Sequence, residues 1–102
     1  MPKLTVGAHT VTLVDRFPAK SFFPLHRLLR WYADGHYLGD RSLDEDVRPY
    51  VGTVTEWDYP GDPAQFEAWT DLDVLTELPQ LIGAINTHIV AQIEQTGAEA
   101  KN

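Results

Sequence analysis

The sequence predicts a small, mainly α-helical domain of the α+β class, in which an N-terminal β-hairpin precedes three or four helices. Apolar and polar residues alternate clearly only within residues 4–14, whereas apolar spacings of three and four dominate the rest of the chain. A chain of 102 residues with 43% hydrophobic residues can bury one core. We therefore expect residues 1–96 to form a single globular domain and residues 97–102 a flexible C-terminal tail.

The hairpin is indicated by two short alternating segments that flank a glycine. Leu4 and Val6 alternate with polar residues before residues 7–10, and Val11 and Leu13 do so after them. Two alternating runs joined by a short glycine-containing segment are typical of an antiparallel hairpin.

The first helix is predicted to begin at Ser21 as the N-cap, with Pro24 tolerated in the first turn. It should end near Gly35, because glycine readily adopts the left-handed conformation that closes a helix. Apolar residues recur at helical spacing between these limits: Phe22, Leu25, Leu28, Leu29 and Tyr32.

A second helix is predicted at Ser42, because Ser42 and Glu45 have the spacing of a capping box. The following residues 47–57 fit two descriptions. Their apolar residues keep helical spacing, yet Val51, Thr53, Thr55 and Trp57 also alternate as in a strand. We favour a helix that is kinked or restarted at Pro49.

Two further helices are expected. Asp62 is placed as an N-cap with Pro63 at the first helical position of a short helix carrying Phe66 and Trp69. Thr76 is placed as the cap of a long last helix that ends at Gly97. A stripe at spacings of three and four marks this region: Leu72, Leu75, Leu78, Leu81, Ile82, Ile85, Ile89 and Ile93.

Composition narrows the classes of function. Fifteen acidic residues against eight basic ones give a net charge of −7, so phosphate backbones and anionic lipids are repelled over most of the surface. No stretch approaches the roughly 20 apolar residues that cross a bilayer. The absence of cysteine suits a reducing compartment. We expect a cytoplasmic protein that binds neither nucleic acid nor membrane.

No motif in the sequence points to catalysis. The four histidines, at positions 9, 26, 36 and 88, lack the i, i+4 spacing of a helical zinc pair. Ser21 and Ser42 are explained as helix caps, and neither phosphate-binding loop is present. We therefore expect no catalytic residue, metal or cofactor. The alternative, a small enzyme that combines His and Asp from distant segments, would require His26, His36 or His88 to be essential for activity.

The aromatic residues are the best indication of a binding surface. Trp and Tyr dominate the energetic centres of interfaces, and a domain this small cannot easily bury many of them. We predict a partner-binding surface around Trp57, Tyr59, Phe66 and Trp69. It would continue along an apolar stripe, unless that stripe is the core: Leu72, Leu75, Leu78, Leu81, Ile82 and Ile85.

Two segments, WDYPGDP at residues 57–63 and LDVLTELPQLI at residues 72–82, resemble the second half of small tail assembly chaperones of long-tailed bacteriophages. The resemblance covers roughly the C-terminal half of the chain. It implies a non-enzymatic protein that coats the hydrophobic tape measure protein before the tail tube forms. It also predicts homo-oligomerisation or client-dependent solubility. An apolar stripe on an acidic domain agrees with helix-in-groove binding of such a client.

Two non-enzymatic alternatives remain open. One is a structural virion part, such as a tail or head completion protein. The other is an acidic inhibitor that mimics nucleic acid and blocks a basic host protein. The carboxylates available for such mimicry are Asp44, Glu45, Asp46, Asp58 and Asp62.

Overall fold

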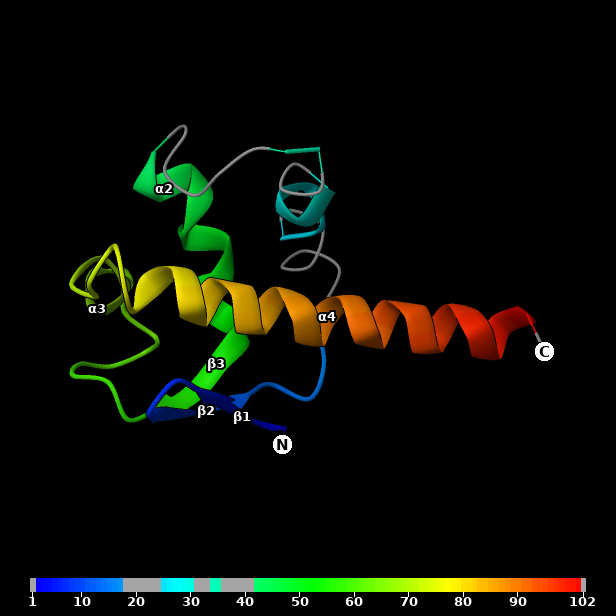
Figure 1. Ribbon diagram of the computed structural model, residues 1–102, viewed down its shortest axis with the longest axis horizontal. Helices are drawn as coiled ribbons and strands as arrows, with labels where there is room; N and C mark the ends of the chain where they lie inside the picture. Colours follow the sequence, from blue (N-terminus) through cyan, green and yellow to red (C-terminus); the bar gives the residue numbers. More distant parts are fainter. Residues whose placement is uncertain (1, 18–24, 31–33, 36–41, 102) are drawn as a thin grey trace.

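The computed structural model describes residues 2–17, 25–30, 34–35 and 42–101. Its sheet has three antiparallel strands in the order β1-β2-β3 (Figure 1). These strands are β1 (Lys3–Val6), β2 (His9–Leu13) and β3 (Val54–Trp57). Strand β2 is central, and β1 and β3 pair with its two edges.

The predicted N-terminal hairpin is confirmed, with a turn tighter than residues 7–10. Val6 pairs with His9, which leaves Gly7 and Ala8 as the connection. Gly7 has φ of +60°, and a Cβ at this position would lie 2.9 Å from Oε1 of Gln80. Glycine is favoured here by the left-handed backbone conformation, whereas the flexible end of the Gln80 side chain could move aside for a Cβ.

The prediction of a mainly α-helical domain with only a hairpin is wrong, because residues 54–57 form a third strand. Val54 pairs with Leu13 and Trp57 with Val11, with an irregularity between Thr12 and Leu13. Val54 is 5% exposed. Pairing with the open edge of β2 and burial of the Val54 side chain favour a strand here, although the apolar residues of this segment have helical spacing.

Helical residues before β3 agree in part with the sequence. Residues 25–30 are helical, and Gly35 adopts a left-handed φ of +98° in the turn after them. Helix α2 (Leu43–Asp46) is capped as predicted, because the hydroxyl of Ser42 accepts the amide of Glu45 at 3.1 Å. The 3₁₀ helix η1 (Arg48–Thr53) then replaces the expected kinked helix. The predicted cap at Ser21 lies outside the described residues.

The last two helices begin later than expected. Asp62 accepts the amide of Ala64 in a turn, and α3 (Phe66–Thr70) starts four residues after Asp62. Thr76 was predicted to cap the helix α4 (Leu78–Lys101). Instead, the carboxylate of Asp73 accepts backbone amides in the turn before it. Helix α4 continues through position 97, so the predicted glycine stop is also wrong.

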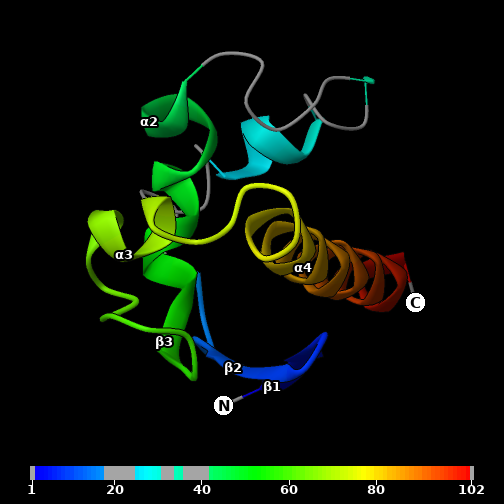
Figure 2. The same ribbon diagram turned by 60° about the vertical axis from the view of Figure 1, so that its left-hand side comes forward.

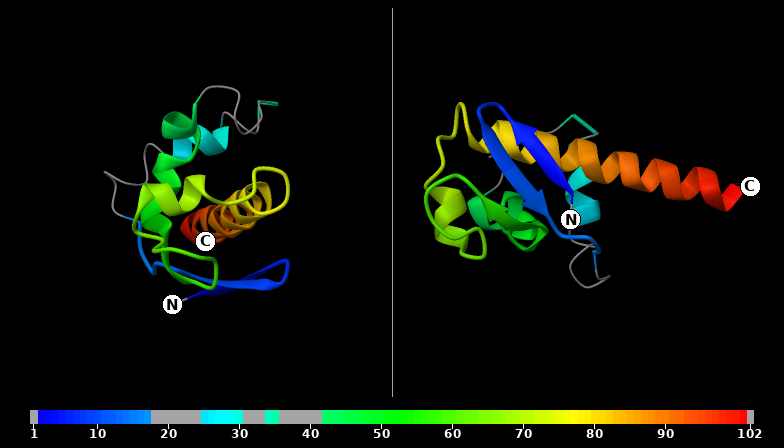
Figure 3. Two further views of the ribbon diagram at one scale, coloured as in Figure 1. Left: turned by 90° about the vertical axis from the view of Figure 1, so that its left-hand side faces the viewer. Right: turned by 90° about the horizontal axis from the view of Figure 1, so that it is seen from below.

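Helix α4 is the centre of the arrangement. Seen almost along its axis, the sheet lies on one side of α4, and η1, α3 and helical residues 25–30 lie around its other sides (Figures 2 and 3). The core gathers buried residues from all of these elements and from the start of η1: Val11, Leu13, Leu25, Val47, Tyr50, Trp69, Leu81, Ile85 and Ile89. The C-terminal part of α4 extends beyond this body (Figure 1).

Candidate functional site

The aromatic residues predicted to bind a partner form a cluster that is mostly internal. Trp69 is fully buried and Tyr59 is 4% exposed, whereas Trp57 and Phe66 are half-buried. The Trp57 ring lies 5.2 Å from that of Trp69 and 5.4 Å from that of Tyr59, centroid to centroid. Burial, together with the negative charges of Glu77 and Asp58, raises the pKa of Tyr59. This cluster therefore joins β3 to α3 and leaves only edges of Trp57 and Phe66 to solvent.

The predicted leucine stripe from Leu72 to Ile85 is buried except at one position before α4. Leu75 is 84% exposed and its neighbour Val74 is 63% exposed, whereas the other five members of the predicted stripe are buried. These five pack in the hydrophobic core: Leu72, Leu78, Leu81, Ile82 and Ile85. Of the six stripe residues predicted to bind a partner, Leu75 is therefore the one that the folded monomer leaves exposed.

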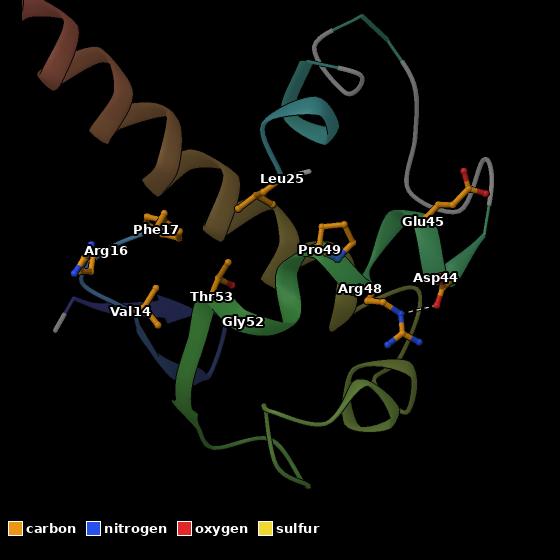
Figure 4. Close-up of a pocket in the computed structure, with 10 residues that line it drawn as sticks. All are labelled: Val14, Arg16, Phe17, Leu25, Asp44, Glu45, Arg48, Pro49, Gly52 and Thr53. Carbon is orange, nitrogen blue, oxygen red and sulfur yellow. Dashed lines mark hydrogen bonds and ion pairs between the residues drawn. The ribbon is translucent and has the colours of Figure 1, made fainter. Parts of the chain in front are cut away.

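A pocket of about 390 Å³ lies between the end of β2, helical residues 25–30 and the α2–η1 segment (Figure 4). Its volume is near the small end of the roughly 300–1,000 Å³ typical of ligand pockets. Six of its described lining residues contribute a mainly apolar wall: Val14, Phe17, Leu25, Pro49, Gly52 and Thr53. The pocket suits a few aliphatic or aromatic carbons.

Charged side chains surround this wall on two sides. Arg16 lies beside Val14 and Phe17, across the pocket from Asp44, Glu45 and Arg48 (Figure 4). Arg48 pairs with Asp44, and its guanidinium lies 4.1 Å from the ring centroid of Phe66. The pocket thus has an apolar floor and a polar rim, which is the arrangement of many binding sites and interfaces.

A second exposed feature is the turn formed by residues 71–77, which we call the acidic turn. It presents Val74 and Leu75 between Asp71, Asp73 and Glu77. Asp73 Oδ1 accepts the amides of Leu75 and Thr76, each at 2.8 Å, and Glu77 accepts the amide of Asp73 at 2.8 Å. These hydrogen bonds restrain the backbone that carries the two exposed aliphatic side chains.

His9 and Asp58 form the clearest contact between titratable side chains. Nδ1 of His9 lies 2.8 Å from Oδ1 of Asp58, and the amide of Thr10 donates to Oδ2 at 3.2 Å. The His9 ring stacks on Tyr59 with centroids 4.0 Å apart. These contacts tie the hairpin to the segment after β3, and they orient both side chains.

The other predicted absences concern metals and membranes. Within the described ranges, no group of three or more His, Asp or Glu side chains could hold a metal ion. Position 36, one of the four histidines, lies outside those ranges. No helix in the described part of the chain has the length and apolar run needed to cross a bilayer.

Comparison with known proteins adds no relative. No protein-family model matches the chain, and no curated protein or solved structure is similar enough to establish a relationship.

Sequence reasoning missed the pocket because its walls come from three segments that are far apart in the chain. Only Pro49 and Gly52 gave a local signal, since they interrupt helical spacing exactly where the chain turns into η1. The exposure of Leu75 was also hidden, because its spacing matches that of the buried Leu72 and Leu78.

Proposed function

We propose that this protein binds another protein without catalysing a reaction, and that an apolar side chain of the partner enters the pocket beside η1. The observation that carries the proposal is the apolar wall of a 390 Å³ concavity, bordered by charged side chains that include the Asp44–Arg48 pair. Such a site removes apolar surface of a partner from water, while its rim sets the orientation of the bound segment.

The resemblance to tail assembly chaperones suggests the nature of the partner. A tape measure protein is a long helical client, and a helix presents its apolar residues every three or four positions. One such residue would occupy the pocket, and the charged rim would contact polar neighbours on the same helix. The net charge of −7 would help to keep the complex soluble.

Gly52 provides a direct test of this site. It lines the pocket, and a Cβ at this position would meet no atom within 4 Å. Gly52→Leu should fill the pocket with little strain in η1. Gly83→Leu is the matched control, because a Cβ at Gly83 also meets open space, on α4 and away from the pocket.

The experiment coexpresses each variant with a fragment of the tape measure protein from the genome that encodes this chain, and measures the soluble fraction of the fragment. The wild-type protein and Gly83→Leu should both raise that fraction, whereas Gly52→Leu should not. If the wild-type protein leaves the fragment insoluble, the client assignment is wrong. Equal rescue by Gly52→Leu would show that binding occurs elsewhere.

A further inference from the structure

The acidic turn presents a small apolar projection that the fold itself does not use. Val74 and Leu75 are 63% and 84% exposed, and the hydrogen bonds of Asp73 and Glu77 fix the backbone beneath them. Polar residues at both positions would leave these hydrogen bonds unchanged, because the amides of the main chain make them. The fold therefore gives no reason for two adjacent aliphatic residues here.

The pocket beside η1 has the complementary shape and chemistry. Its walls are mainly apolar and its volume is about 390 Å³. None of its described lining residues comes from the acidic turn, so the turn of one copy does not reach the pocket of the same copy. We propose that Val74 and Leu75 of one copy insert into the pocket of a second copy, which joins the molecules head to tail.

Charge supports this pairing on one side of the pocket. Arg16 lies at the pocket edge, and no ion-pair partner of its guanidinium is found among residues 2–17, 25–30, 34–35 and 42–101. The acidic turn carries three carboxylates, Asp71, Asp73 and Glu77, around its two aliphatic residues. An inserted turn can place one of these carboxylates near Arg16, on the side of the pocket opposite Asp44 and Glu45.

The small size of the contact sets its strength. Stable interfaces bury roughly 1,200–2,000 Å² in total, and two aliphatic side chains in one pocket bury less than this. Two copies of net charge −7 also repel one another. We therefore expect association only at protein concentrations of roughly 0.1 mM and above.

A contact between two different surfaces leaves a free turn at one end and a free pocket at the other, so it continues into a ring or a filament. It also occupies the pocket assigned above to the client, so the two would compete. That competition rests on the proposed function. Self-association is measured without a client, so the failure of either proposal leaves the other standing.

Sedimentation velocity over about 0.02–1 mM protein tests the contact. The wild-type mass should rise with concentration. Val74→Gln/Leu75→Gln, which changes no charge, should weaken association at least tenfold. Val90→Gln/Ile93→Gln is the matched control: it makes two equivalent exchanges at side chains that are each 41% exposed on α4, and it should associate like the wild type.

Mixing two defective variants gives a sharper result. Gly52→Leu retains the acidic turn, whereas Val74→Gln/Leu75→Gln retains the pocket, so neither should associate alone. Their equimolar mixture should form a 1:1 dimer and nothing larger. A wild-type protein that stays monomeric at 1 mM, equal weakening by the α4 control, or a mixture that remains monomeric would overturn the proposal.

Discussion

Two tryptophans in the aromatic cluster make the same hydrogen bond in different surroundings. Nε1 of Trp69 donates to the carbonyl of Pro63, and Nε1 of Trp57 donates to the carbonyl of Gly61, each at 2.8 Å. Trp69 is fully buried, whereas Trp57 is half-buried. Because water can replace only an exposed donor, the two bonds contribute unequally to stability.

Phenylalanine at each position should measure this difference. Trp69→Phe leaves a buried carbonyl unpaired and removes ring volume, so we expect a loss of about 2–4 kcal/mol in the free energy of unfolding. Trp57→Phe should lose about 1 kcal/mol or less. Urea denaturation followed by circular dichroism provides both values. Equal losses would contradict the burial assigned to Trp69.

Two carboxylates should make the protein sensitive to acid. Burial acts to raise the pKa of Asp58, but the His9 side chain and the Thr10 amide outweigh it and lower that pKa below 3.8. The amides of Leu75 and Thr76 likewise lower the pKa of Asp73 below 3.8. Both groups bind protons more weakly when folded. Their stabilisation is therefore complete above the unfolded pKa near 4 and is lost as the pH falls through the lower, folded values.

Carboxyl carbon shifts recorded by NMR between about pH 2 and pH 6 should show both midpoints below 3.8. In parallel, Asp73→Asn should reduce the dependence of unfolding free energy on pH below about 4, because the asparagine does not titrate. A midpoint at or above 3.8 for Asp73 would mean that its two amide contacts do not form in solution.

Individual elements differ in how far the sequence predicts them. The hairpin and the capping box at Ser42 follow from local signals, because their hydrogen bonds join residues close in the chain. Strand β3 could not be predicted in this way, because residues 51–57 fit both the helical spacing and the alternation of a strand. The pairing with β2, which is distant in the chain, decides between them. The pocket depends on the same long-range packing, and so does the burial of most of the predicted binding surface.

The two faces of helix α4 can be compared by changing isoleucine to alanine once on each face. Ile85 is fully buried and Ile93 is 41% exposed. Ile85→Ala should lower the free energy of unfolding by about 2–5 kcal/mol, because it leaves a cavity in the core. Ile93→Ala should change it by less than about 1 kcal/mol. Chemical denaturation of both variants checks this, and similar losses would mean that α4 packs differently.

The whole molecule carries a net charge of −7 on 102 residues. Like charges destabilise a folded state, and salt screens them over a Debye length of roughly 10 Å at 0.1 M. Raising sodium chloride from about 0.02 M to 0.5 M should therefore raise the Tm by a few degrees. Thermal unfolding should be recorded at about 10 µM protein, where self-association is negligible. A Tm that falls with salt would show that ion pairs such as Asp44–Arg48 outweigh repulsion.

The length of α4 affects how the protein can be labelled. Its 24 residues span roughly 36 Å at 1.5 Å per residue, close to the 43 Å longest dimension of the molecule. The final turns lead away from the sheet and from α3 (Figure 1). A fluorophore or surface tether attached after this helix would hang clear of the domain, so immobilised protein would keep both of its contact surfaces open for binding measurements.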